Sequence, residues 1–210
     1  MPTRILLADD HLIVREALKA LLEGEGFSIV AEVGDGQEAT RVARERCPDV
    51  AVLDLAMPLL NGLDAAREIL RSCPRAKVIL LTIHTEDHYV FEARRAGIKG
   101  YVSKTQAAAD LVQAINEVLR GGVYLSPSIS QRVVQAHPTK SEGRADPLAP
   151  REREVLQLLA EGKTSKEIAR LLGIAVGTAE EYRFRIMKKL DIHSTAGVVR
   201  YAIRQGLVQP

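Results

Sequence analysis

Short apolar runs alternate with segments of helical period through the first 120 residues, and no other feature constrains the fold as strongly. The runs predict strands near 4–8, 28–33, 49–54, 77–82 and 99–103. The segments between and after them predict helices near 11–24, 36–46, 62–72, 87–96 and 107–120. Successive strand–helix units are typical of a parallel sheet with helices on both faces. We therefore expect an α/β domain built on a doubly wound sheet of five parallel strands.

The last third of the chain shows the helical period alone. Helices are predicted near 151–161, 165–172, 177–190 and 195–205. Before them, residues 136–148 mix Pro, Gly and charges of both signs without periodicity, as linkers do. A length of 210 residues suits two small domains. We expect a first domain at 1–122, a linker at 123–147 and an all-α domain at 148–210.

Charge separates along the same division. Residues 1–125 carry 15 Lys and Arg against 18 Asp and Glu, whereas residues 149–210 carry 11 against 7. An acidic first part and a basic second part indicate different partners, and a basic helical domain favours nucleic acid.

Cysteine usage and hydropathy indicate the compartment. Cys47 and Cys73 each precede a proline and show no metal-binding spacing, so we expect free thiols and a reducing environment. No apolar stretch has the length of a signal peptide or of a membrane-spanning helix. We therefore expect a cytoplasmic protein with no membrane partner.

Polar side chains stand where the predicted strands end. Asp9 and Asp10 follow the first strand, and Asp54 ends the third. Thr82 ends the fourth strand, and Lys104 follows the fifth. Open α/β sheets bind their ligands in the crevice at the carboxyl ends of the strands. We expect the three carboxylates, the hydroxyl and the ammonium to share one cleft.

This combination of groups suits Mg2+ and a phosphoryl group. Adjacent carboxylates repel unless a cation offsets them, and Mg2+ accepts one or two carboxylates together with phosphate oxygens. Asp54 is the candidate nucleophile, because a carboxylate can carry a phosphoryl group covalently. Thr82 and Lys104 would bind the phosphoryl oxygens. Taken singly, Asp9 and Asp10 could cap a helix and Asp54 could merely end a strand; their combination favours the phosphoryl site.

The segments LLADDH, VAVLDLAMPLLNGLD, VILLTIH and GYVSK, in this order and spacing, resemble the receiver domain of two-component response regulators over residues 4–120. The resemblance implies a flavodoxin-like sheet and a sensor histidine kinase that phosphorylates Asp54. It also implies that Mg2+ is bound by Asp9, Asp10, Asp54 and the backbone carbonyl of Ala56.

The same resemblance assigns three further roles. It implies that Thr82 is the switch hydroxyl and Lys104 the phosphate-binding lysine. Tyr101 matches the switch aromatic, whose side chain moves inward when the hydroxyl engages phosphate, and the plain alternative, a half-buried strand tyrosine, is compatible with that role. Receivers often have proline after the lysine, and this chain has Thr105.

The stretch TSKEIARLLGIAVGTAEEYRFRIMKKL has helix–turn–helix form, with Gly173 at the turn. At about 100° per residue, Ala179, Ile186 and Leu190 share the face of the second helix that meets the core. The opposite face either enters the major groove of DNA or is the solvated face of a protein-interaction domain. The candidate DNA-binding residues are Thr178, Glu180, Glu181, Arg183, Phe184, Arg185, Lys188 and Lys189.

The segments APREREVLQLLAEGKTSKEIARLLGI and IMKKLDIHSTAGVVRYAIRQGLV resemble the LuxR-type DNA-binding domain over about 148–208. Its pairing with a receiver implies the NarL/FixJ subfamily of transcriptional regulators, which bind promoter DNA. Such domains commonly pair through their last helix. The apolar seam of a homodimer would then be Val198, Val199, Ala202 and Ile203.

The second helix departs from the LuxR-type pattern at three positions. Gly177 stands where the family has lysine, Glu181 where it has a small polar residue, and Tyr182 where it has histidine. Absence of the lysine removes a phosphate contact, and Glu181 repels phosphates although it can accept a hydrogen bond from cytosine. Two readings stay open: altered sequence specificity, or DNA binding that is impaired or needs an auxiliary factor.

Two other functions compete with a phosphorylated transcription regulator. A haloacid-dehalogenase-type phosphatase also uses aspartate, lysine and Mg2+, but it needs an Asp-x-Asp pair after the first strand, and here Asp9 and Asp10 are adjacent. A regulator that is independent of phosphorylation, or impaired in DNA binding, would act through protein contacts. We expect a phosphoacceptor rather than an enzyme.

Overall fold

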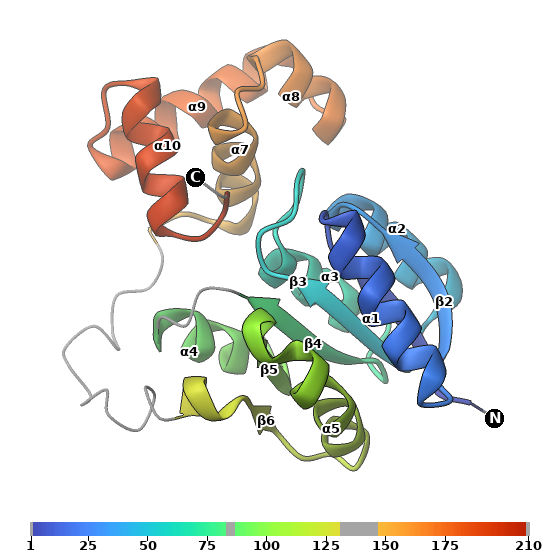
Figure 1. The fold of residues 1–210 in the computed structure, drawn as a ribbon. Coiled ribbons are helices and arrows are strands. Elements are labelled where there is room, and N and C mark those ends of the chain that lie inside the picture. The colour runs from blue at the N-terminus through green and yellow to red at the C-terminus, as the bar shows by residue number, and fades with distance from the viewer. Residues whose placement is uncertain (1, 83–86, 131–146, 209–210) are drawn as a thin grey trace. The chain divides into compact units, whose positions relative to one another are not determined.

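The computed structural model describes residues 2–82, 87–130 and 147–208. The chain divides into two compact units, Met1–His137 and Pro138–Pro210. The first unit contains the parallel sheet, and the described part of the second is helical (Figure 1).

A six-stranded parallel sheet organises the first unit, in the order β2-β1-β3-β4-β5-β6. Its strands are β1 (Arg4–Ala8), β2 (Ser28–Val33), β3 (Val50–Asp54), β4 (Lys77–Thr82), β5 (Gly100–Ser103) and β6 (Tyr124–Leu125). The helices between them are α1 (Leu12–Gly24), α2 (Gly36–Arg46), α3 (Gly62–Ser72), α4 (Asp87–Arg95) and α5 (Ala107–Leu119), with a 3-10 turn η1 (Lys104–Gln106). The doubly wound α/β fold is confirmed, and the predicted bounds hold within about a residue.

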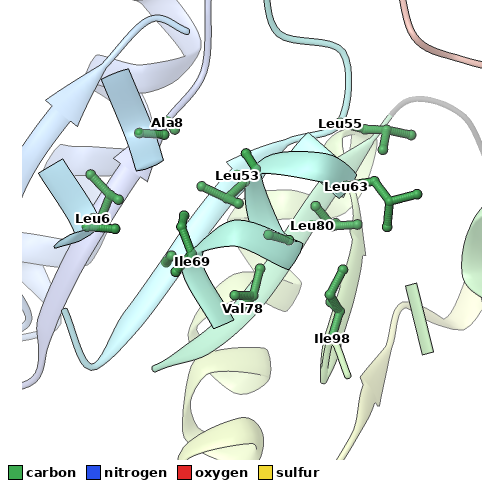
Figure 2. Packing of buried hydrophobic residues seen from close by; sticks show 14 of the residues in the cluster. Leu6, Ala8, Leu53, Leu55, Leu63, Ile69, Val78, Leu80 and Ile98 are labelled. Carbon is green, nitrogen blue, oxygen red and sulfur yellow. The ribbon is translucent and has the colours of Figure 1, made fainter. Parts of the chain in front are cut away.

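Alternate residues of the strands belong to two separate hydrophobic clusters, because successive side chains of a strand point to opposite faces of the sheet. Leu6, Leu53 and Leu80 pack on the face covered by α2, α3 and α4 (Figure 2). Ile5 and Val52 belong to the other cluster, which α1 and α5 cover. With both faces buried, the central strands β1, β3 and β4 are nearly continuous apolar runs, as buried parallel strands usually are.

The prediction of five strands is wrong by one short strand. Tyr124 and Leu125 form β6, which pairs with Gly100 and Tyr101 of β5. Two residues are too few for a recognisable apolar period, which is why the sequence did not indicate this strand. The sheet therefore includes part of the linker predicted at 123–147, whose residues 131–146 lie outside the described part of the chain.

The second unit packs its helices around an aliphatic core. They are α7 (Pro150–Ala160), α8 (Ser165–Leu172), α9 (Val176–Leu190) and α10 (Thr195–Arg204). Helix α7 contacts α8, α9 and α10, and its Val155, Leu156 and Leu158 are fully buried. Gly173 ends α8 with φ of 63°, a left-handed conformation that glycine adopts without strain. The turn predicted between the two central helices is therefore present.

None of the helices within 2–82, 87–130 and 147–208 is long and apolar enough to cross a bilayer.

Candidate functional site

The predicted cleft lies at the carboxyl edge of the sheet. Asp9 follows β1, Asp54 ends β3, Thr82 ends β4 and Lys104 follows β5. These four strands are neighbours in the sheet, so their carboxyl ends meet at one edge. Asp9, Asp54 and Thr82 are each 2% exposed or less, which places the groups in a pocket rather than on a surface.

Lys104 connects the two buried carboxylates. Its Nζ lies 2.8 Å from Oδ2 of Asp54 and 2.9 Å from Oδ2 of Asp9. The lysine side chain is 12% exposed and reaches the pocket from the first residue of η1. One ammonium therefore holds two carboxylates that would otherwise repel each other.

The environment sets the protonation of this pair. Burial raises the pKa of Asp54; the Lys104 ammonium lowers it, and Asp9 and Asp10 raise it, so that the pKa stands above its usual value. Burial alone would lower the pKa of Lys104, but attraction and hydrogen bonding to Asp54 and Asp9 outweigh it and raise the pKa. Lys104 is therefore cationic at neutral pH, as a phosphate-binding residue must be.

The acidic residues match the ligands of a hard cation. Ligand atoms of Asp9, Asp10, His11 and Asp54 all lie within 4.8 Å of one another. Asp10 is the more accessible member of the pair, with a side chain 28% exposed, whereas Asp9 is buried. Three carboxylates around an opening to solvent fit Mg2+, which keeps several waters and prefers oxygen ligands.

The loop after β3 depends on a close approach of backbones. A Cβ on Gly62 would lie 2.0 Å from the carbonyl oxygen of Asp54, so only glycine fits there. The amide of Gly62 donates to the carbonyl oxygen of Leu55 at 2.8 Å. Asn61 then caps α3 by accepting from the amide of Asp64 at 3.0 Å. The loop that carries Ala56 is thus fixed directly beside Asp54.

Thr82 and Tyr101 occupy positions compatible with their predicted roles. The strand register pairs Leu81 with Asp54, so Thr82 is the next residue along β4. Tyr101 is 1% exposed and belongs to the buried cluster that includes Val90 of α4 and Ile129 beyond β6. Its side chain is therefore inward, in contact with the cluster that includes a residue beyond β6 of the first unit.

The structure adds two residues to the pocket that the sequence did not single out. His11 Nδ1 lies 2.7 Å from Oδ1 of Asp10, and the His11 amide donates to Oδ1 of Asp9 at 2.9 Å. The guanidinium of Arg15 donates to the carbonyl oxygen of Asp9 at 2.5 Å. His11 directly follows the acidic pair, a position that could have revealed it. Arg15 lies one helical turn further on, where only the fold brings it back.

The second candidate surface is the outer face of α9. Ala179 and Ile186 are buried as predicted, while Leu190 is only partly buried. The eight candidate DNA-binding residues are all exposed, and Phe184 is 70% exposed. The apolar and polar faces of the helix are therefore placed as the helical period predicts.

Two of the basic residues on α9 already have partners within the unit. A guanidinium nitrogen of Arg185 lies 2.6 Å from Oε1 of Glu181, and the Cζ atom of Arg185 lies 5.5 Å from the ring centre of Tyr182. Lys189 Nζ lies 2.6 Å from Oε2 of Glu152, a buried carboxylate of α7. Burial raises the pKa of Glu152, but bonds from Lys189 and from the Ala149 amide outweigh it and leave the pKa lowered. Lys189 therefore serves the packing of the unit.

The four residues of the apolar seam predicted on α10 differ in burial, and the seam itself stays a prediction. Val198 is 3% exposed and Ala202 is fully buried, because this side of the helix packs against α7. Val199 and Ile203 are partly exposed and lie one residue further round the helix. In the single chain, Val199 and Ile203 therefore leave apolar surface partly exposed, whereas Val198 and Ala202 are covered.

Comparison with known proteins assigns a family to each of the two units. Residues 5–116 match the response regulator receiver domain family, and residues 146–202 match the luxR family of bacterial regulatory proteins. The transcriptional regulatory protein MctR of Rhizobium johnstonii is 36% identical over 206 residues, which cover 98% of this chain and 95% of MctR.

Two further relatives match almost the whole chain. The response regulator UvrY of Escherichia coli K12 is 35% identical, over 97% of this chain and 94% of UvrY. A solved complex of the two-component response regulator RcsB with DNA has a TM-score of 0.60 at 27% identity, over 96% of this chain and 98% of RcsB. The chain belongs to the two-component response regulators of the NarL/FixJ subfamily, transcription regulators in which a receiver domain precedes a LuxR-type DNA-binding domain.

Proposed function

We propose that Asp54 accepts a phosphoryl group from the phosphohistidine of a sensor histidine kinase. A carboxylate oxygen of Asp54 attacks phosphorus, an O–P bond forms, and the P–N bond of the donor breaks with its electron pair remaining on the imidazole. The position of Lys104, whose ammonium lies 2.8 Å from Asp54, carries this proposal. The same ammonium can hold the oxygens of the transferred group.

The remaining pocket residues assist the transfer. Asp9, Asp10, Asp54 and the carbonyl of Ala56 would hold Mg2+, which supplies positive charge where the anionic donor approaches. The Thr82 hydroxyl would donate a hydrogen bond to a transferred oxygen. Tyr101, buried under the segment beyond β5, would hold its inward position while Thr82 is so engaged.

Phosphorylation in solution tests the acceptor. Wild-type protein incubated with acetyl phosphate and Mg2+ should gain the mass of one phosphoryl group, whereas Asp54→Asn should gain none. Asp49→Asn is the matched control, because Asp49 is an exposed aspartate at the other end of β3. Phosphorylation of Asp54→Asn at the wild-type rate would overturn the assignment.

We also propose that the site stores a phosphoryl group and does not turn over phosphate esters. Asp9 and Asp10 are adjacent, and the nucleophile is the separate Asp54, an arrangement unlike that of an Asp-x-Asp phosphatase. Steady release of p-nitrophenol from p-nitrophenyl phosphate would contradict this proposal.

For the second unit we propose promoter binding through α9. The exposed Arg183 and Lys188 can contact DNA phosphates, while the exposed Thr178, Glu180 and Phe184 would contact the walls or base edges of the major groove. RcsB, which has been solved with DNA, supports this reading by its similarity over the whole chain. Pairing through Val199 and Ile203 of α10 would present two such helices to two half-sites.

The ion pair between Glu181 and Arg185 keeps a second candidate function open. It neutralises one of the basic groups on α9, which favours a regulator with weak DNA binding that acts through protein contacts. Titrating the phosphorylated protein against a promoter library at low salt separates the two. Sequence-selective binding supports promoter recognition, and its absence supports the second function.

A further inference from the structure

The receiver unit brings together two thiols that phosphoryl transfer does not use. Cys47 follows α2 and Cys73 follows α3, at a separation of 26 residues in the chain. Their Sγ atoms lie 2.7 Å apart. A disulfide bond is about 2.05 Å long, so the two sulfurs lie within reach of each other.

The two thiols are held at the amino edge of the sheet. Cys47 lies just before β3 and Cys73 just before β4, and these strands are neighbours. The amide of Lys77 donates to the carbonyl oxygen of Asp49 at 2.9 Å, which joins the two entering segments. The pair therefore rests on the packing of α2 against α3 and on the adjoining strands, not on a loose loop.

The thiols differ in their access to solvent. Cys47 is exposed, whereas Cys73 is 5% exposed and donates to the carbonyl oxygen of Ala43 at 3.2 Å. Burial raises the pKa of the Cys73 thiol, and the neighbouring Cys47 raises it further. Its access to solvent lets Cys47 react first with an oxidant, and the adjacent Cys73 can resolve the product. The raised pKa keeps the Cys73 thiol protonated, so this second step requires loss of its proton.

We propose that Cys47 and Cys73 form a reversible dithiol–disulfide site that responds to hydrogen peroxide. The Cys47 sulfur attacks one peroxide oxygen, the O–O bond breaks, and a sulfenic acid forms while the other oxygen leaves as water. The Cys73 sulfur then displaces the hydroxyl, which leaves as a second water, and the S–S bond forms. The thiols lose two electrons and two protons, which the peroxide gains. Exchange with a reducing dithiol restores both thiols.

The bond would stabilise the receiver unit without entering the phosphoryl pocket. It closes the segment 47–73, which contains β3 and α3, and so removes conformational freedom from the unfolded chain. Asp54 lies at the opposite end of β3 from Cys47. The site is therefore expected to act on stability and on the association of α2 with α3.

Treatment of the full-length protein with hydrogen peroxide tests the site. After denaturation the treated protein should have lost both thiols and the mass of two hydrogen atoms, and digestion should give a peptide linking Cys47 to Cys73. The unfolding temperature of the first unit should rise by about 10 °C. The helical unit, which contains no cysteine, should keep its unfolding temperature, and a reducing dithiol should reverse every change.

Cys47→Ser and Cys73→Ser are the matched variants. Cys47→Ser should keep its single buried thiol, whereas Cys73→Ser should have Cys47 oxidised to a sulfenic or sulfinic acid. Neither variant should form the internal cross-link or show the temperature rise. Because Cys47 is exposed, Cys47→Ser carries the test even where the buried replacement at Cys73 prevents folding. In treated wild type, retention of both thiols, disulfide-linked dimers in place of the internal bond, or oxidation of Cys47 to the sulfinic acid would each overturn the proposal.

Discussion

Gly62 shows how one residue without a side chain can determine the geometry of the acceptor. Its Cα passes so close to β3 that an added Cβ would meet the carbonyl oxygen of Asp54 at 2.0 Å. We expect Gly62→Ala to lower the free energy of unfolding by about 3 kcal/mol and to slow phosphorylation, because the backbone of Asp54 or α3 must shift. Chemical denaturation and acetyl-phosphate labelling measure the two effects.

Gly24→Ala is the control for that substitution. Gly24 is the last residue of α1, and an added Cβ would have no atom within 4 Å. Alanine there should leave stability unchanged or raise it by about 0.5 kcal/mol through reduced freedom of the unfolded chain. Equal stability losses from the two substitutions would show that the approach to Asp54 is not the cause.

Glu152 is a buried carboxylate whose contribution depends on pH. It accepts hydrogen bonds from Lys189 and from the Ala149 amide, and its pKa is lowered in the folded protein. We expect Glu152→Gln to cost about 1–2 kcal/mol at pH 7, since the charge-assisted bond to Lys189 is lost. Glu181→Gln, which breaks an exposed pair with Arg185, should cost less than about 0.5 kcal/mol.

The pH profile identifies the charge as the cause. A lowered pKa in the folded state stabilises the protein fully above the usual value of 4.5, and this stabilisation is lost as the pH falls through the lowered pKa. The stability difference between wild type and Glu152→Gln should therefore be constant at neutral pH and shrink in acid. A difference that persists at the lowest pH would assign the effect to packing.

At the scale of elements, β6 adds residues that follow α5 to the edge of the sheet, beside β5. The amides of Tyr124 and Ser126 donate to the carbonyl oxygens of Lys99 and Tyr101 at 2.8 and 3.0 Å. Ser126 is fully buried; its hydroxyl accepts from the Ser103 amide at 3.1 Å and donates to Asp110. The segment is therefore joined to β5 and to α5 at once.

Removing that hydroxyl should release the segment. In Ser126→Ala the Ser103 amide loses its partner in a buried place, which costs about 1–3 kcal/mol. We expect the amides of Tyr124 and Ser126 to exchange with solvent at least roughly tenfold faster, which hydrogen exchange measures. Ser128→Ala is the control, because the bond from Ser128 to Gln106 is exposed. Equal exchange rates of the Tyr124 and Ser126 amides in the two variants would show that the Ser126 hydroxyl does not hold the segment.

The sequence predicts long elements well and predicts contacts between elements poorly. KVILLT is a continuous apolar run, so burial of β4 on both faces could be predicted, and with it the position of Thr82. The apolar stripe of α10 could be predicted too. Val198 and Ala202 form one apolar stripe of α10, and Val199 and Ile203 form the next. Both stripes are equally apolar in the sequence, so only the packing against α7 shows which of them faces inward.

The site residues divide in the same way. That Asp54 and Lys104 lie close together was predictable because the carboxyl ends of parallel strands share an edge, whatever the sequence distance between the residues. The bond between Lys189 and Glu152 joins residues 37 apart on two different helices, a spacing that no period reveals. The sequence alone therefore did not indicate that Lys189, a candidate DNA contact, also binds Glu152 of α7.

At the scale of the whole molecule, the chain joins an acidic receiver to a basic DNA-binding unit. The outer face of α9 in that unit carries less positive charge than the LuxR-type pattern, which has lysine at the position of Gly177. Gly177 is exposed at the start of α9, and an added side chain would meet no atom within 4 Å. Glu181 also forms an ion pair with Arg185 on the same helix, which neutralises that positive charge. The electrostatic part of DNA affinity should therefore be limited at this helix rather than at the receiver.

Gly177→Lys tests where the output of the molecule is limited. In the phosphorylated full-length protein, the added charge should strengthen DNA binding and steepen the dependence of log affinity on log salt by about one unit. Gly177→Ala separates charge from helix propensity: it stabilises α9 by up to about 1 kcal/mol but adds no charge, so its salt slope should match wild type. Equal affinity gains and equal slopes for both variants would assign the limitation to the stability of α9. A steeper slope for lysine alone would mean that the absence of one positive charge at position 177 limits the electrostatic part of DNA affinity.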